Sequence, residues 1–267
     1  MSPSGVAGAP ASSIALGALE GEWVVVTGGS KGIGRAIAER MLDAGANVVV
    51  VARNRAEIDV CAAELSVSAR ESQRVIGLTA DVANRASVDA LFDELHERIP
   101  RLDHFVANAG TGRVTPFFDL TAEEVDEVVA LNLTGTIQCM QLAARMMCEH
   151  PIDNSCIVVV SSIRGLGVVP GRLIYAATKA GINQAVRVAA AELAPLGIRA
   201  NIVSPGITET PLTAKNPEVF AEMTANVPMG RAAQPRDLAE AATFLCSPAA
   251  QFITGLNMIV DGGESLR

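Results

Sequence analysis

Short apolar runs alternate with longer helical patterns from Glu22 onward, and this alternation restricts the possible folds more than any other feature. The short runs have the length and residue types of buried strands, and the longer stretches have the apolar spacing of amphipathic helices. We expect strands at 23–27, 47–52, 74–79, 102–106, 156–161, 199–203 and 257–260, and helices that include 32–44, 55–68, 86–98, 122–149 and 173–194. Strict alternation predicts an α/β fold: a single-domain, doubly wound parallel sheet of about seven strands with helices on both faces.

The composition agrees with this fold and excludes several functions. Of the 267 residues, 49 % are hydrophobic and only 3 % aromatic, so the core consists mainly of Ala, Val, Leu and Ile, as in sheets buried on both faces. A net charge of −8 offers no general attraction for nucleic acid or anionic lipid. No stretch reaches the roughly 18 apolar residues of a membrane helix. We therefore expect no nucleic-acid or membrane partner.

The cysteines indicate a reducing compartment. They are odd in number, widely separated, and lie within apolar or helical segments: Cys61, Cys139, Cys148, Cys156 and Cys246. This arrangement predicts free thiols in a cytoplasmic protein, with neither a disulfide framework nor a metal site.

The beginning of the chain differs in composition from the rest. It is mostly Ser, Ala, Gly and Pro, without the basic start or apolar run of a secretory signal. We expect residues 1–19 to form a flexible extension. Residues 20–267 contain no internal repeat and no linker, so we expect them to form one domain.

A glycine-rich turn follows the first expected strand, where residues 27–34 read Thr-Gly-Gly-Ser-Lys-Gly-Ile-Gly. Gly28, Gly32 and Gly34 permit a tight turn and let backbone amides approach a pyrophosphate at the start of the next helix. In doubly wound sheets the ligand lies beyond the carboxyl ends of the strands. A tight connection without a ligand is the alternative, but the position between strand and helix favours dinucleotide binding.

Tyr175, the only tyrosine, stands four positions before Lys179. One helical turn places both side chains on the same face, where an ammonium group favours the phenolate over the phenol. Lowering the phenol pKa from about 10 by roughly two to three units requires about 3 to 4 kcal/mol. Taken alone, the pair favours a plainer interpretation, a half-buried tyrosine beside a solvated lysine. The other motifs reverse this preference.

Together these motifs resemble the short-chain dehydrogenase/reductase family, and within it the NADP-dependent ketoreductases of the 3-oxoacyl-reductase-like group. The resemblance extends from about Gly21 to Gly263 and implies a Rossmann fold. It rests on Gly28-x3-Gly32-x-Gly34, Asp81-Val82, Asn108-Ala109-Gly110, Asn132, Ser162, Tyr175-x3-Lys179 and Pro205-Gly206, in that order. One departure is Ala107, where relatives often have a second asparagine.

The resemblance implies a catalytic group of Asn132, Ser162, Tyr175 and Lys179. Tyr175 would exchange a proton with the reacting oxygen as general acid/base. Lys179 would hold the nicotinamide ribose and lower the pKa of the tyrosine. Ser162 would hydrogen-bond the reacting oxygen, and Asn132 would hold a water that links Lys179 to solvent. Each residue alone has a structural explanation, since Ser162 could end a strand and Asn132 could bond within its helix.

The expected cofactor is NADP(H). NAD-preferring relatives carry an acidic residue where this chain has Ala52, whereas Arg53 and Lys31 resemble the basic pair that binds the additional phosphate of NADP. The alternative is that both are surface cations. The expected cofactor-binding residues are Gly28, Ser30, Lys31, Gly32, Ile33, Gly34, Arg53, Asp81, Val82, Asn108, Ala109, Gly110, Tyr175, Lys179, Pro205, Gly206, Thr208 and Thr210.

The substrate is less well defined. By resemblance it lies between the segments after Ser162, after residues 108–110 and after Pro205-Gly206, with residues 207–230 as a mobile lid. These segments supply an apolar lining that suits a ketone: Val114, Phe117, Phe118, Ile163, Leu166, Val168, Val169, Leu212, Val219, Phe220, Met223 and Met229. Three nearby arginines, Arg113, Arg164 and Arg172, either contact a carboxylate or phosphate or are solvated.

We therefore predict an NADP(H)-dependent oxidoreductase that interconverts a ketone and a secondary alcohol. The first alternative is a 3-oxoacyl-acyl-carrier-protein reductase, but residues 147–153 and 192–197 lack the basic patches that bind an acidic carrier. The second is a non-catalytic NADP sensor. The helix of Tyr175 is rich in Ala and Gly on more than one face, which predicts a partner subunit and, by resemblance, a homotetramer.

Overall fold

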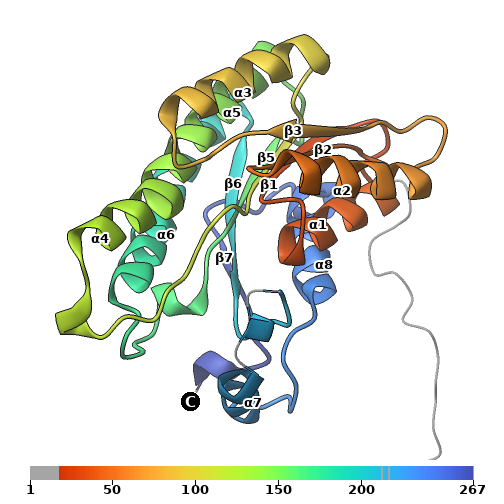
Figure 1. The fold of residues 1–267 in the computed structure, drawn as a ribbon. Coiled ribbons are helices and arrows are strands. Elements are labelled where there is room, and N and C mark those ends of the chain that lie inside the picture. Colours follow the sequence, from red (N-terminus) through yellow and green to blue (C-terminus); the bar gives the residue numbers. More distant parts are fainter. Residues whose placement is uncertain (1–17, 212, 216, 267) are drawn as a thin grey trace, which may run out of the picture.

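A single sheet of seven parallel strands forms the centre of the computed structural model, which describes residues 18–211, 213–215 and 217–266. The strand order is β3-β2-β1-β4-β5-β6-β7 (Figure 1). The strands are β1 (Trp23–Thr27), β2 (Asn47–Ala52), β3 (Val75–Thr79), β4 (His104–Ala107), β5 (Cys156–Val160), β6 (Arg199–Pro205) and β7 (Asn257–Val260). The expected fold class is confirmed.

Helices cover both faces of the sheet. One face packs against α1 (Gly32–Asp43), α2 (Arg55–Ser68) and α8 (Pro235–Cys246), and the other against α3 (Arg85–Arg98), α5 (Thr136–Glu149) and α6 (Leu173–Leu193). The remaining α-helices are α4 (Ala122–Val129), which precedes α5, and α7 (Pro217–Ala225), which lies beyond the end of β6 near the C-terminus (Figure 1). This two-layered cover explains why the central strands are apolar without alternation.

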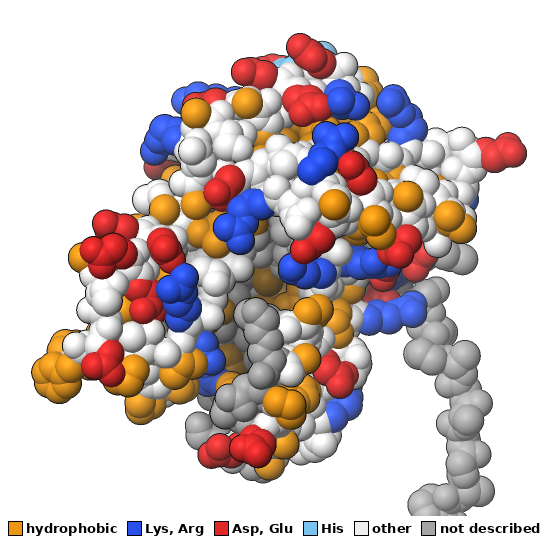
Figure 2. Space-filling view, in the orientation of Figure 1, with side chains coloured by type: hydrophobic (Ala, Val, Ile, Leu, Met, Phe, Trp, Pro, Cys, Tyr) orange, Lys and Arg blue, Asp and Glu red, His pale blue; other side chains and the backbone are white. Residues whose placement is uncertain are grey.

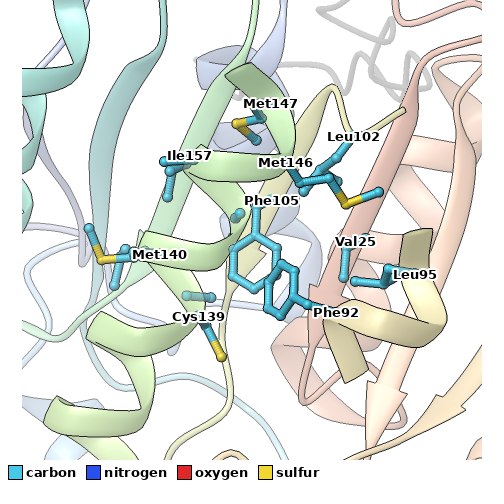
Figure 3. Packing of buried hydrophobic residues seen from close by; sticks show 14 of the residues in the cluster. Val25, Phe92, Leu95, Leu102, Phe105, Cys139, Met140, Met146, Met147 and Ile157 are labelled. Carbon is cyan, nitrogen blue, oxygen red and sulfur yellow. The ribbon is translucent and has the colours of Figure 1, made fainter. Parts of the chain in front are cut away.

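The larger hydrophobic cluster lies between the sheet and the second layer of helices (Figure 3). Its centre is Phe105 of β4, whose ring centroid lies 5.9 Å from that of Phe92 in α3. Met140 and Met147 of α5 pack around this pair, where flexible thioether side chains fill an irregular space. The cluster packs α5 against β4. The candidate site begins directly after β4 and directly before α5.

Most expected boundaries agree with the structure within two residues. The main difference is the helix expected at 122–149, which is interrupted by a π-helical turn, η2 (Ala130–Gly135). The helix α8 was not among the expected ranges. In the part of the chain that the structure describes, no helix combines the length and the apolar character required to cross a membrane.

Candidate active site

The glycine-rich turn joins β1 to α1 at the switch point, where the strand order reverses between β1 and β4. Gly28 and Gly32 have φ angles of +64° and +58°, which favour glycine. Asn108, directly after β4, donates from Nδ2 to the carbonyl oxygens of Thr27 and Gly28 at 3.1 Å each. The turn is thereby tied to the neighbouring strand.

The helix α1 begins close to this turn because Gly34 has no side chain. A Cβ at Gly34 would lie 2.3 Å from the carbonyl oxygen of Gly28 and 2.4 Å from Nδ2 of Asn108. The N-cap residue, Lys31, makes no side-chain cap, and the first turn of α1 contains no acidic residue. Ile33 packs into the hydrophobic cluster below α1. The positive end of the helix and its amides thus suit a phosphate group.

The expected basic pair lies at the edge of the same region. Arg53 is exposed directly after β2, and Nζ of Lys31 lies 3.2 Å from Oε2 of Glu57 in the first turn of α2. Ser30, Lys31 and Glu57 border a cavity of about 490 Å³. The sequence analysis did not single out Glu57. The signal for it was a carboxylate in the first turn of the helix that follows the second strand.

The π-helical turn η2 carries Asn132, whose side chain is 1 % exposed. Its Oδ1 accepts a hydrogen bond from N of Thr111 at 2.9 Å, and its Nδ2 donates to the carbonyl oxygen of Thr111 at 2.8 Å. Nδ2 also donates to Oγ1 of Thr178 in α6 at 3.4 Å. Asn132 therefore holds the loop after β4 against two helices. π-Helical turns of this kind frequently occur at functional sites.

Asp81 and Val82 lie in the turn that follows β3. Oδ1 of Asp81 accepts a hydrogen bond from N of Ala83 at 3.0 Å, which shapes the turn. The carbonyl oxygen of Val82 faces the π-helical turn, because a Cβ at Gly135 would lie only 2.0 Å from it. Neither residue hydrogen-bonds to the expected catalytic group within the described ranges.

Lys179 is buried beneath the loop after β4. Its Nζ donates to the carbonyl oxygen of Val160 at 2.9 Å. A Cβ at Gly110 would lie 3.7 Å from this Nζ and 3.3 Å from Oδ1 of Asn132, so the three residues meet at one place. Burial lowers the pKa of Lys179 to about 8. Desolvation thus disfavours the charged form of Lys179 relative to an exposed lysine.

Tyr175 retains its proton at neutral pH. Burial raises the pKa of its phenol, while a hydrogen bond with Ser162 and the charges of Arg172 and Arg164 act in the opposite direction. The lowered pKa expected from the sequence pattern involves a cationic cofactor as well as the lysine and stays a prediction, and in the chain alone the pKa shift is upward. The reason is that desolvation outweighs the favourable partners, and Nζ of Lys179, 5.8 Å from the ring centroid, is directed to a carbonyl oxygen.

The loop after β6 is held by Glu264, a residue that sequence reasoning missed. Its Oε2 accepts a hydrogen bond from N of Ile207 at 2.7 Å, and its Oε1 accepts one from Arg164. Gly206 allows this approach, since a Cβ there would lie 2.7 Å from Oε2 of Glu264. The turn at 261–264, Asp-Gly-Gly-Glu after the last strand, was the available signal.

The same loop also approaches the glycine-rich turn. A Cβ at Gly32 would lie 3.6 Å from Cβ of Thr210. Thr208 is buried and donates to the carbonyl oxygen of Gly206 at 3.0 Å. Pro205 ends β6. The expected cofactor residues of this loop therefore lie beside those of the first turn.

A cavity of about 700 Å³ lies beside the start of α6, where Tyr175 is located. Four residues of the expected apolar lining border it: Val114, Phe117, Val168 and Val169. The lining expected from Leu212 and the side chain of Val219 falls outside the described residues. Tyr175 itself does not line this cavity, whereas its helix neighbours Arg172, Leu173 and Ala176 do.

The fold and this arrangement of residues agree with an oxidoreductase, and the comparisons with known proteins show that class. A family model described as Enoyl-(Acyl carrier protein) reductase matches residues 28–265. The chain belongs to the short-chain dehydrogenase/reductase family.

Relatives with different named substrates are similar over nearly the whole chain. A 3beta-hydroxysteroid dehydrogenase 1 of Eggerthella lenta is 36 % identical over 93 % of this chain and 95 % of its own length. A 3-oxoacyl-acyl-carrier-protein reductase of Aquifex aeolicus is 32 % identical over 92 % of this chain and 98 % of its own length. The crystal structure of a short-chain type dehydrogenase/reductase from Mycobacterium marinum matches with a TM-score of 0.89 and 30 % identity. The match covers 94 % of this chain and 98 % of that protein. The comparisons thus establish the family of the chain, but the names of its relatives point to different substrates.

Proposed function

We propose that the protein interconverts a ketone and a secondary alcohol with NADP(H). The observation that carries the proposal is the position of Tyr175, which hydrogen-bonds with Ser162 and has Nζ of Lys179 5.8 Å from its ring centroid, at the carboxyl edge of the sheet. When bound, NADP(H) supplies or accepts the hydride. Residues 20–267 form the catalytic domain in this proposal, with 207–230 as its lid.

In this proposal, protein side chains supply the proton and position the reacting groups. During reduction, the phenol of Tyr175 donates its proton to the carbonyl oxygen as negative charge develops there. The hydroxyl of Ser162 donates a hydrogen bond to the same oxygen. Lys179 provides a buried positive charge next to the tyrosine, and Asn132 keeps the loop after β4 in place. The roles reverse for oxidation.

The residues of the glycine-rich turn fit NADP(H) by their shape and charge. Gly34 lets the start of α1 pack against Gly28 and Asn108, and Gly110 keeps the backbone of the loop after β4 close to Asn132 and Lys179. No acidic residue ends β2, and Arg53 is exposed beside the turn. Glu57 offsets the charge of Lys31, whereas Arg53 has no salt bridge with any described residue, so we propose that Arg53 binds the additional phosphate.

We expect kcat/KM with NADPH to exceed that with NADH by at least about tenfold, because a guanidinium group stabilises the phosphate that only NADPH carries. Replacing Arg53 by Asp is expected to reverse this preference, since a carboxylate repels phosphate and accepts hydrogen bonds from ribose hydroxyls. The matched control is Arg55→Asp, at a neighbouring exposed position where Arg55 pairs with Asp59. Equal efficiency with both cofactors would refute the preference.

The proposed function is tested by NADPH oxidation with a panel of ketones. Turnover of free ketones supports it, and cofactor binding without turnover on any ketone would favour the NADP sensor. The carrier-linked alternative is favoured by the relative from Aquifex aeolicus, so the same 3-oxoacyl group is assayed free and on its carrier. The net charge of −8 supports the free ketone, because it is unfavourable for binding an acidic carrier. On the face that Figure 2 shows, acidic and basic side chains are interspersed.

We also propose that the protein assembles as a homotetramer. The helix α6 leaves Ala177, Ala180 and Val188 exposed in the single chain, and a partner subunit would cover them. A monomer in light scattering at micromolar concentration would contradict this assembly.

A further inference from the structure

Three arginines lie near the candidate site, but only two of them are neutralised. Nη2 of Arg113 lies 2.7 Å from a carboxylate oxygen of Glu127, and Arg164 pairs with Glu264. Arg172 has no carboxylate partner among the residues that the structure describes. It donates from Nη1 to the carbonyl oxygen of Arg113 at 3.3 Å, a long hydrogen bond. Its charge is therefore left without a counter-charge.

The guanidinium of Arg172 lies close to Tyr175. The point where a Cβ of Gly112 would stand is 3.5 Å from Nη1 of Arg172 and 3.3 Å from Cδ2 and Cε2 of Tyr175. Both side chains thus border the same small volume above the loop after β4. The cation is also partly desolvated, since burial lowers the pKa of Arg172. A desolvated cation without a counter-charge is unfavourable, and an anionic ligand would relieve that cost.

The cavity next to Arg172 is apolar. Arg172 is the one charged side chain among its lining residues, which otherwise include Val114, Phe117 and Val168. An apolar chain fits this lining, and the guanidinium at its edge fits a carboxylate through two parallel hydrogen bonds.

We propose that Arg172 binds a carboxylate carried by the ketone itself, so that the substrate is an oxo acid with an apolar chain. This inference rests on the proposed function. Because Tyr175 and Arg172 border one small volume, the carbonyl and the carboxylate are separated by a few bonds. The phosphate of a carrier arm lies much farther from the reacting carbonyl, which disfavours it as the anion.

The test compares each of two oxo acids, 2-oxooctanoate and 4-oxononanoate, with its neutral methyl ester. In the wild type we expect kcat/KM to be at least about 30-fold higher for the better of the two acids than for its ester. The reason is that only the acid can form charge-assisted hydrogen bonds with the guanidinium of Arg172. Replacing Arg172 by Met is expected to bring this ratio close to one, and Arg172→Lys to retain part of it. The control Arg113→Met removes a paired, exposed arginine and is expected to keep the wild-type ratio.

The outcomes separate this inference from the proposed function. If the esters are reduced but neither acid is preferred, or if the preference persists in Arg172→Met, the inference is wrong and the reductase activity stands. If no ketone, ester or acid is reduced, both fail. If Arg172→Met instead weakens only a preference for a 3-oxoacyl phosphopantetheine over the matching pantetheine thioester, the anion is a carrier phosphate and the oxo-acid proposal is overturned.

Discussion

Replacing Tyr175 by Phe is expected to lower kcat for ketone reduction by about 10³-fold, within the usual range for loss of a general acid. The phenol carries the proton at neutral pH because burial raises its pKa, and the substitution removes only the hydroxyl group. The ring that packs against Gly112 remains, so the protein is expected to stay folded. The measurement is the rate of NADPH oxidation at saturating ketone, for the parent and the variant.

Two controls make this result interpretable. The thermal midpoint and the affinity for NADPH are measured on the same preparations, and both should stay close to the parent values. Ser162→Ala is expected to reduce kcat as well, and the double variant is expected to lose less than the product of the two single losses, because both groups act on one oxygen. A Tyr175→Phe variant that retains kcat within about threefold would mean that another group donates the proton.

The fold and much of the candidate site could be predicted because their signals are local. The apolar runs mark the strands, and a residue directly after a strand lies at the carboxyl edge of a parallel sheet. Gly28 and Asn108 are far apart in the sequence, yet both directly follow neighbouring strands, and the structure joins them by a hydrogen bond. Periodicity places each of them at the end of its strand, and the strand order of a doubly wound sheet makes the first and fourth strands neighbours.

The features that could not be predicted depend on contacts between distant segments. Arg164 and Glu264 are 100 positions apart, and no local pattern indicates that they pair. The four-residue spacing of Tyr175 and Lys179 predicts a shared helix face but not the depth of burial. That depth determines the direction of both pKa shifts.

The interruption of the long helix at 122–149 has the same origin. Its apolar residues recur at helical spacing throughout, so the sequence predicts one uninterrupted helix. In the structure, η2 contains Gly135, which packs directly against the backbone at Val82, and this contact comes from a turn far away in the sequence. A glycine within a helical pattern was the visible signal, because such a glycine often has a packing reason.

Replacing Gly135 by Ala is expected to destabilise the protein by about 3 kcal/mol, the upper end of the usual range for an overpacked core. The new Cβ would lie 2.0 Å from the carbonyl oxygen of Val82, and the backbone of one segment must move. For a chain of this size the thermal midpoint should fall by roughly 6 to 12 °C. Because Asn132 lies in the same π-helical turn, kcat should fall as well.

The matched control is Gly181→Ala, which places the same methyl group in α6, where it faces Leu133 of the π-helical turn. A Cβ at Gly181 would lie 3.4 Å from Cδ1 of Leu133, an ordinary van der Waals distance. Alanine is favoured over glycine inside a helix by about 1 kcal/mol, so this variant should be as stable as the parent or slightly more stable. Equal thermal midpoints for the two variants would show that helix propensity governs both positions. A large loss of thermal midpoint confined to Gly135→Ala would show instead that the contact with Val82 governs this position, and an accompanying fall in kcat would connect the contact to Asn132 in the same turn.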